Sequence, residues 1–177
     1  MGHSLQKHLP FGDDTRSGAE ISECGEYRYR LWRFWSDRPA VCFVMLNPST
    51  ADAVDDDRTV SRCMAFARSW GAGGIYVANL FALRSTDPQG LLSMSDPVGR
   101  GNNDHIADLA SRSRIVVCAW GTHSGARLQA LIRARAKTVC GVLKNRRLMC
   151  LGTAKDGSPR HPLYLAADTK LVQWSSK

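Results

Sequence analysis

The chain has 177 residues, enough for one domain with a substantial hydrophobic core. Its formal net charge of +8 favours a polyanionic partner such as nucleic acid, although a basic balance also occurs in proteins that only need solubility. The six cysteines are widely spread and lack zinc-type spacing, so we expect reduced structural thiols, no metal site and no cofactor. No apolar run could cross a bilayer and no apolar signal core stands at the N-terminus, so we expect a cytoplasmic protein without a membrane partner.

The N-terminal part of the chain carries two patterns. Residues 1 to about 22 are polar and lack sustained periodicity, so we expect a loosely ordered arm over residues 1–22 and a single α/β domain over residues 23–177. Residues 27–35 alternate aromatic and basic side chains, the period-two pattern of a strand with one apolar face. An edge strand is the favoured interpretation, and a nucleic-acid grip by these aromatic and arginine side chains is the alternative.

The remaining elements alternate in type along the chain. The continuous apolar run over residues 40–46 predicts a strand covered on both faces. After it the sequence predicts a helix over 59–70, a strand over 75–80, short helices over 89–94 and 103–111, a strand over 115–120, an amphipathic helix over 124–136 and a strand over 148–151. This alternation predicts a three-layer α/β/α sandwich with a mainly parallel central sheet.

Polar residues and glycine follow the apolar segments at four places. They are Asn47, Asn79, Gly121 and His161. Because the ligand crevice of an open α/β sheet lies beyond the carboxyl ends of its strands, these residues are the natural site candidates. His123, in the same turn as Gly121, is a weaker polar candidate.

Charged residues are unevenly distributed. After residue 110 the only acids are Asp156 and Asp168, against thirteen basic residues, so this half of the chain is a candidate phosphate-binding face. Four acids instead follow the first motif closely: Asp52, Asp55, Asp56 and Asp57. A helix cap is their favoured role.

The order of the motifs resembles the uracil-DNA glycosylase superfamily. That superfamily has an Asn-Pro or Asp-Pro after its first core strand, a second strand leading to an Asn, a later strand ending in Trp-Gly, and a C-terminal His-Pro. The matching segments here are Met45-Leu46-Asn47-Pro48, Asn79, Trp120-Gly121 and His161-Pro162. The Asn-Pro form is closest to the mismatch-specific and single-strand-selective branches, and residues 45–52 and 157–164 also look like an uncharacterised bacterial domain family of this size.

The resemblance covers residues 27–174, but each motif is only two to four residues long. Two positions depart from the superfamily's pattern. Leu46 stands where a glycine usually precedes the Asn or Asp, and Leu163-Tyr164 stand where Ser-Pro commonly follows the His-Pro. These departures affect the expected base contacts more than the reaction class.

The resemblance implies a monofunctional DNA glycosylase that flips out a damaged or modified base and hydrolyses its N-glycosidic bond, leaving an abasic site. Asn47 would hold the attacking water, with Asp52 as a candidate assistant, and His161 would hydrogen-bond the base as negative charge develops on it. Asn79 would read the Watson–Crick edge of the base and Phe81 would stack on it. Structural alternatives remain: a helix-capping Asx turn at Asn47, a buried turn at Asn79, a structural histidine, and core packing of Phe81, which is favoured.

The segment around the His-Pro motif supplies the expected DNA contacts. By resemblance, Lys155 and Arg160 lie in the loop that presses into the duplex minor groove. Leu163 or Tyr164 would fill the space that the flipped base vacates, because apolar wedges between bases support distortion.

Two small polar residues, Ser49 and Thr50, follow the Asn-Pro motif where uracil-specific relatives place a bulky aromatic. They predict a pocket that admits a larger base, such as a bulky 5-substituted pyrimidine of phage DNA. The setting would then be DNA repair or anti-phage defence.

Two other functions fit the same motifs. A nucleoside or nucleotide hydrolase would share Asn47, Asn79 and His161 but would need no duplex grip. A non-catalytic DNA-binding module would bind DNA without forming an abasic site. In the favoured interpretation the partner is single- or double-stranded DNA, and the protein is a monomer.

Overall fold

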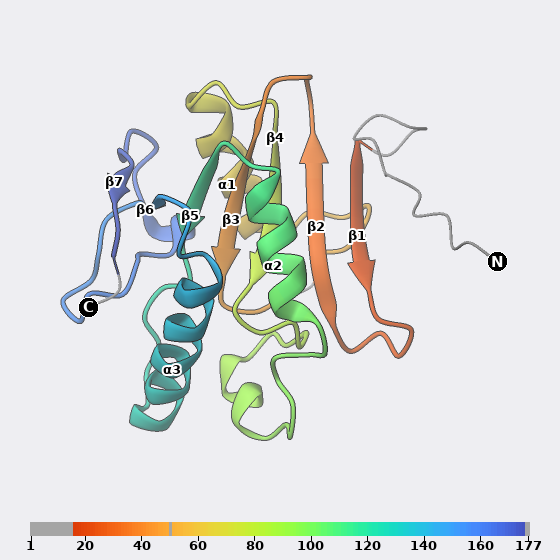
Figure 1. The fold of residues 1–177 in the computed structure, drawn as a ribbon, viewed down its shortest axis with the longest axis vertical. Helices are drawn as coiled ribbons and strands as arrows, with labels where there is room; N and C mark the ends of the chain where they lie inside the picture. Colours follow the sequence, from red (N-terminus) through yellow and green to blue (C-terminus); the bar gives the residue numbers. More distant parts are fainter. Residues whose placement is uncertain (1–15, 50, 176–177) are drawn as a thin grey trace.

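The computed structural model describes residues 16–49 and 51–175. Its centre is a seven-stranded mixed sheet with the strand order β1-β2-β4-β3-β5-β6-β7 (Figure 1). The strands are β1 (Ser17–Ile21), β2 (Arg28–Phe34), β3 (Ala40–Met45), β4 (Gly74–Asn79), β5 (Ile115–Cys118), β6 (Leu148–Cys150) and β7 (Val172–Gln173). The helices are α1 (Arg58–Ser69), α2 (Asn102–Ser111) and α3 (Ala126–Val142), with the 3-10 turns η1 (Pro88–Leu92) and η2 (Pro162–Tyr164). The α/β class predicted from the alternation of elements is confirmed.

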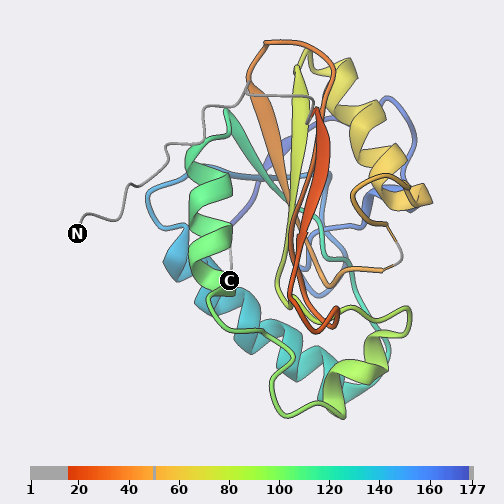
Figure 2. The same cartoon turned by 90° about the vertical axis from the view of Figure 1, so that its right-hand side faces the viewer.

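The helices cover both faces of the sheet, so the fold has three layers. Figure 2 shows α1 on one side of the sheet, and α2 and α3 on the other. Because successive strand residues point to opposite faces, β3 sends Val41 and Phe43 into the core under α1, and Cys42 and Val44 into the core under α2 and α3. All six residues of β3 are buried, as its apolar run predicts.

The four central strands β4, β3, β5 and β6 are parallel, whereas the pairings of β1 with β2, β2 with β4, and β6 with β7 are antiparallel. The sheet is therefore mixed rather than mainly parallel. Its parallel part aligns the ends of β3 and β4, since Met45 pairs with Asn79. The alignment continues past both strands, where Leu80 N–H donates to the Met45 carbonyl and Phe81 N–H donates to the Leu46 carbonyl, each at 2.9 Å.

Two expectations for the N-terminal part need correction. The sequence predicts an arm through residue 22, but residues 17–21 form β1, and residues 1–15 lie outside the described part. β2 is also not an edge strand, because β1 pairs with its outer side. Gly18 permits this pairing: a Cβ added there would lie 2.2 Å from the Trp32 ring. The β1 segment is short and carries little apolar surface, so it gives no strand signal.

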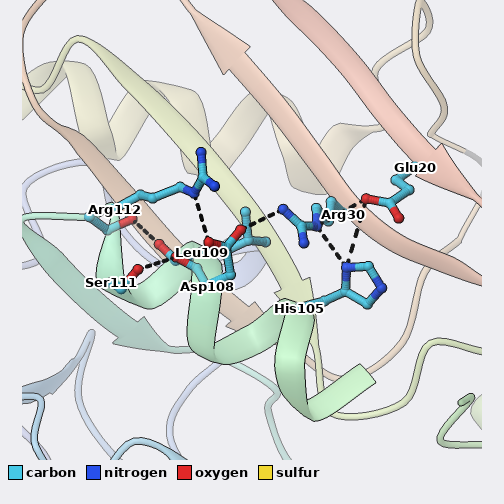
Figure 3. Close-up of polar contacts among 8 residues, drawn as sticks. Glu20, Arg30, His105, Asp108, Leu109, Ser111 and Arg112 are labelled. Carbon is cyan, nitrogen blue, oxygen red and sulfur yellow. Dashed lines mark hydrogen bonds and ion pairs between the residues drawn. The ribbon is translucent and has the colours of Figure 1, made fainter. Parts of the chain in front are cut away.

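An ion network fastens α2 to the sheet edge (Figure 3). Arg30 Nη1 contacts Asp108 Oδ2 at 2.6 Å, and Arg30 Nε contacts Glu20 Oε2 at 3.0 Å. The same Nε donates to His105 Nδ1 at 2.7 Å, so this ring nitrogen is an acceptor and the imidazole is neutral. Burial lowers the pKa of His105, and the charge of Arg30 acts in the same direction, against the opposing effect of Glu20. Arg30 of β2 thus fixes the position of α2 against the sheet.

Within the described ranges, no helix is long and apolar enough to span a membrane. In residues 16–49 and 51–175, no group of three or more His, Cys, Asp or Glu side chains is placed to hold a metal ion.

Candidate functional site

Four of the predicted site residues, Asn47, Ser49, Asn79 and His161, line one cavity of about 140 Å³, which we call the inner pocket. It lies where the parallel strands end: Asn47 follows β3, Asn79 closes β4, and Trp120 follows β5. His161 and His123 complete the wall on the side of η2. The parallel pairing of β3 with β4 and with β5 thus assembles residues that are far apart in the sequence.

A larger cavity of about 620 Å³, the outer cavity, adjoins the inner pocket. The two share five lining residues: Thr59, Thr86, Pro88, His123 and His161. The outer cavity also has Arg160, Leu163 and Tyr164 in its wall. A ligand that enters the inner pocket therefore has room to extend outward past His161.

Asn47 is held by the loop that follows β4. Its Nδ2 donates to the Ser85 carbonyl at 2.7 Å and to the Pro48 carbonyl at 3.1 Å. Both amide hydrogens are thereby used, so the Oδ1 acceptor is the part of this amide left for a ligand. Asn47 does not cap α1, because Asp57 is the N-cap of that helix.

Asn79 is almost fully buried, with 1% of its surface exposed. Its backbone carbonyl accepts a hydrogen bond from Asn102 Nδ2 at 3.1 Å, which fixes the end of β4. Within residues 16–49 and 51–175, its own side-chain Nδ2 has no hydrogen-bond partner, although it is buried at the inner pocket. An unsatisfied buried donor costs roughly 1–3 kcal/mol, so a ligand with an acceptor in this pocket would recover that cost.

His161 presents a neutral imidazole to both cavities. It is the N-cap of η2, and its Nδ1 accepts a hydrogen bond from Leu163 N–H at 3.3 Å, which places the ring hydrogen on Nε2. Burial, followed by the nearby His123, lowers the pKa of His161, while Asp57 acts in the opposite direction. The ring is therefore uncharged at neutral pH and available as a hydrogen-bond donor.

Gly121 allows the His161 segment to approach β5. Its φ of +75° is strained for other residues, and a Cβ added there would lie 3.1 Å from the His161 Cβ. Gly121 N–H also donates to the Pro159 carbonyl at 3.0 Å. The Trp-Gly motif thus works with the His-Pro motif to build one wall.

The acidic cluster contributes a different residue from the one expected. Asp52 Oδ1 accepts from the backbone N–H groups of Val54 and Asp55 at 2.8 and 2.9 Å, and Asp52 is not among the residues that line either cavity. These hydrogen bonds lower the pKa of Asp52, and the one from Asp55 N–H has the larger effect. Asp57 instead lines the inner pocket and caps α1, its Oδ1 accepting from Val60 N–H at 2.8 Å. The predicted helix cap is confirmed at Asp57.

Three proposed base contacts have different outcomes. Ser49 lines the inner pocket. Thr50 lies outside the described residues. Phe81 is fully buried in the core beneath α2 and α3 and lines neither cavity, so in this structure it packs rather than stacking on a ligand. Its backbone N–H makes the last hydrogen bond of the alignment past β3 and β4, to the Leu46 carbonyl at 2.9 Å.

The expected DNA contacts lie around the outer cavity. Arg160 and Tyr164 are exposed, and Tyr164 has 83% of its surface accessible. Leu163 is half-buried in the same wall, and the Tyr164 ring lies 5.8 Å from the His161 ring, centroid to centroid. Lys155 is exposed and lines neither cavity, but it follows Ala154, which does.

Arg28 is a further pocket residue, and the sequence pattern hides it. Only 3% of its surface is exposed, and it lines the inner pocket. Its Nη1 donates to the Ala51 carbonyl at 2.5 Å, whereas its Nε has no acceptor among the described residues. Burial lowers the pKa of Arg28 to about 10, against the opposing effect of Asp57. A buried arginine inside an aromatic and basic alternation gives no distinctive sequence signal.

Comparison with known proteins identifies the family but assigns no activity. A family model described as "Protein of unknown function (DUF1643)" matches residues 28–163, and this range contains Asn47, Asn79 and His161. The searches of curated proteins and of solved structures returned no match. Because the matched range covers most of the chain, this protein belongs to the DUF1643 family.

Proposed function

We propose that this protein is a monofunctional DNA glycosylase with a uracil-DNA-glycosylase-like fold. One observation carries the proposal: Asn47, Asn79 and His161 meet at a single pocket beyond the ends of parallel strands, and the buried Asn79 amide offers a donor for which no described residue supplies an acceptor. These are the residues that the resemblance to the uracil-DNA glycosylase superfamily selects. The three layers and the four central parallel strands are compatible with that fold.

The chemistry required is hydrolysis of the bond between sugar C1′ and the base. The bond breaks with both electrons going to the base, the sugar becomes cationic, and a water oxygen then bonds to C1′ and releases a proton. Asn47 Oδ1 accepts a hydrogen bond from that water. Asp57, whose carboxylate lines the pocket, stabilises the cationic sugar. Asp52, which the sequence suggests as an assistant to Asn47 in holding the water, lines neither cavity.

Two residues act on the base. Asn79 donates to an acceptor on the edge of the flipped base, which compensates for its unpartnered Nδ2. His161, neutral and carrying its hydrogen on Nε2, donates to a base oxygen as negative charge gathers there. A neutral donor suits this step, because it strengthens its hydrogen bond as the charge grows and needs no proton transfer.

DNA is favoured over a free nucleoside as the substrate by the surroundings of the outer cavity. Exposed Arg160 and Tyr164 stand beside it, and a nucleoside pocket would need neither a phosphate contact nor an exposed aromatic. Arg160 and Lys155 contact the phosphates, while Leu163 or Tyr164 fills the space left by the flipped base.

The size of the cavities favours a modified base. Ser49 is a small wall residue of the inner pocket, and the outer cavity continues from it past His161. A bulky 5-substituted pyrimidine, as in modified phage DNA, places its ring in the inner pocket and its substituent in the outer cavity. Anti-phage defence is then the favoured setting, with repair as the other.

The test is abasic-site formation on oligonucleotides that carry uracil, hypoxanthine or bulky 5-substituted pyrimidines, scored by alkaline strand cleavage. We expect cleavage with a substituted pyrimidine. Efficient removal of plain uracil alone would overturn the assignment of a large base. No cleavage, together with tight DNA binding by the folded protein, would favour a binding module.

A further inference from the structure

Arg28 is a buried cation without a carboxylate partner. In residues 16–49 and 51–175, no carboxylate lies within ion-pair distance of its guanidinium, which donates a hydrogen bond to the neutral Ala51 carbonyl. Arg33, on the same strand, contrasts with it: Arg33 Nε contacts Asp56 Oδ1 at 2.8 Å and its other nitrogens donate to three carbonyls. Burying a charge without such compensation is costly, so Arg28 requires another explanation.

The position of Arg28 points to the ligand. Its backbone N–H donates to the Ala82 carbonyl at 2.9 Å, so β2 begins beside the segment that follows Asn79. Both side chains line the inner pocket, and each has one buried donor with no acceptor in the described part of the chain, Arg28 Nε and Asn79 Nδ2. Two unsatisfied donors at one cavity favour a ligand with acceptors, and the charge of Arg28 favours a negative one.

The opposite charge at the pocket is Asp57, and it limits the attraction for anions in general. Among the charged side chains around Arg28, Asp57 has the largest effect on the pKa of Arg28, which it raises. Asp57 also lines the inner pocket. A ligand whose negative charge lies next to Asp57 would be repelled by this carboxylate, whereas one whose negative charge lies next to Arg28 would be attracted. A reaction that separates charge, with a cation on one fragment and an anion on the other, suits both residues.

We infer that Arg28 binds the departing base and stabilises the negative charge that it gains when the bond to the sugar breaks. The inference rests on the proposed function, since the anion is the base of a glycosylase reaction. When the C1′–N bond breaks, the base receives the electron pair, and it leaves after taking up one proton from solvent. Arg28 supplies a fixed positive charge, whereas neutral His161 supplies only a hydrogen bond.

The test uses free bases and needs no excision. The full-length protein is titrated calorimetrically with 5-nitrouracil, whose nitro group acidifies the ring so that it is an anion in mildly alkaline buffer, and with uracil, which is less acidic. We expect the wild type to bind the anion more tightly than uracil by roughly tenfold to a hundredfold, the range of a charge-assisted hydrogen bond. Arg28→Gln should lose this preference.

Arg38→Gln is the matched control, because Arg38 is exposed and precedes β3. It therefore lies at the amino-terminal ends of the parallel strands, whereas the inner pocket lies at their carboxyl ends. This variant should keep the full preference. If Arg28→Gln does not fold, as judged by circular dichroism, Arg28→Lys takes its place and should bind the anion less tightly than the wild type, because it lacks the planar Nε donor. Wild-type affinity for the anion in Arg28→Gln or Arg28→Lys, or no preference in the wild type itself, would overturn the inference.

The outcomes separate this inference from the proposed function. If the preference for the anion depends on Arg28 but no abasic sites form, the pocket is a site for anionic bases and the proposed glycosylase activity is refuted. If the protein excises the base but shows no preference for the anion, the glycosylase activity is supported and the inferred role of Arg28 is refuted.

Discussion

Asn47 and Ser85 join the two loops that build the pocket. Asn47 Nδ2 donates to the Ser85 carbonyl at 2.7 Å, and Ser85 N–H donates to the Pro48 carbonyl at 2.9 Å. This reciprocal pair ties the loop after β3 to the loop after β4. Because the same amide hydrogens cannot also bind a ligand, Asn47 acts through Oδ1 and as a fixed part of the pocket.

Asn47→Ala should abolish excision and leave DNA affinity unchanged. The change removes the water acceptor and two hydrogen bonds, so we expect the free energy of unfolding to fall by about 1–3 kcal/mol. Chemical denaturation, excision and DNA binding are measured on the same preparation. Excision at the wild-type rate would mean that the Asn47 link is only structural.

Asn79→Leu separates a recognition role from a structural one. Leucine has a similar shape and removes a buried donor that has no partner, so the free energy of unfolding should stay the same or rise. Excision should fall by roughly 100-fold, as for the loss of one preorganised polar contact. A strongly destabilised variant would show instead that the Asn79 side chain holds the fold.

Asp57→Asn tests which acid acts on the sugar. Asparagine caps helices about as well as aspartate, so α1 should keep its N-cap and unfold with a free energy within about 1 kcal/mol of the wild type. Excision should fall by about tenfold or more, because the negative charge beside the sugar is lost. Asp55→Asn removes the same charge at an exposed neighbour and should keep the wild-type rate. Equal rates in both variants would remove Asp57 from the mechanism.

The excision rate should depend on pH through His161. Burial and His123 lower the pKa of His161 below its ordinary value of 6.5, so the neutral donor persists through neutral pH. The rate should fall only when the pH drops through that lowered pKa, where protonation of Nδ1 also breaks the bond from Leu163 N–H. His123→Gln removes one cause of the lowering and should move the fall to higher pH. A pH profile identical to the wild type in that variant would contradict this account.

Charge reversal at Arg160 should weaken DNA affinity before it changes the chemistry. Loss of one phosphate contact lowers the slope of log affinity against log salt by about one. Fluorescence anisotropy at several salt concentrations measures that slope, and single-turnover excision at saturating protein should remain near the wild-type rate. Arg38→Glu, at the opposite edge of the sheet, should leave the slope unchanged. Equal effects of the two charge reversals on the salt slope would show that Arg160 makes no specific phosphate contact and that DNA does not bind beside the outer cavity.

Much of the fold follows from periodicity in the sequence. The buried runs of β3 and β4 and the amphipathic pattern of α1 predict their elements within one or two residues. Asn47 and Asn79 could also be predicted, because they stand where parallel strands end together. His161 does not follow a strand: it is the N-cap of η2, well after the end of β6 at Cys150, so its position could not be predicted from strand ends.

The rest depends on contacts that a local pattern does not contain. The segment of β1 is stabilised by its pairing with β2 and by Gly18 under Trp32, so its own residues carry no signal. Among four neighbouring acids, only the three-dimensional path of the loop decides that Asp57 rather than Asp52 lines the pocket. The burial of Arg28 likewise depends on where the loop containing Ala51 lies.

The most direct test of the central claim is to count abasic sites in genomic DNA that carries bulky 5-substituted pyrimidines, after incubation with the wild type and with His161→Ala. Unmodified genomic DNA is the matched control. We predict abasic sites only in the modified DNA and only with the wild type. No abasic sites with the folded wild type, or equal numbers with both proteins, would contradict the claim that this pocket excises a base.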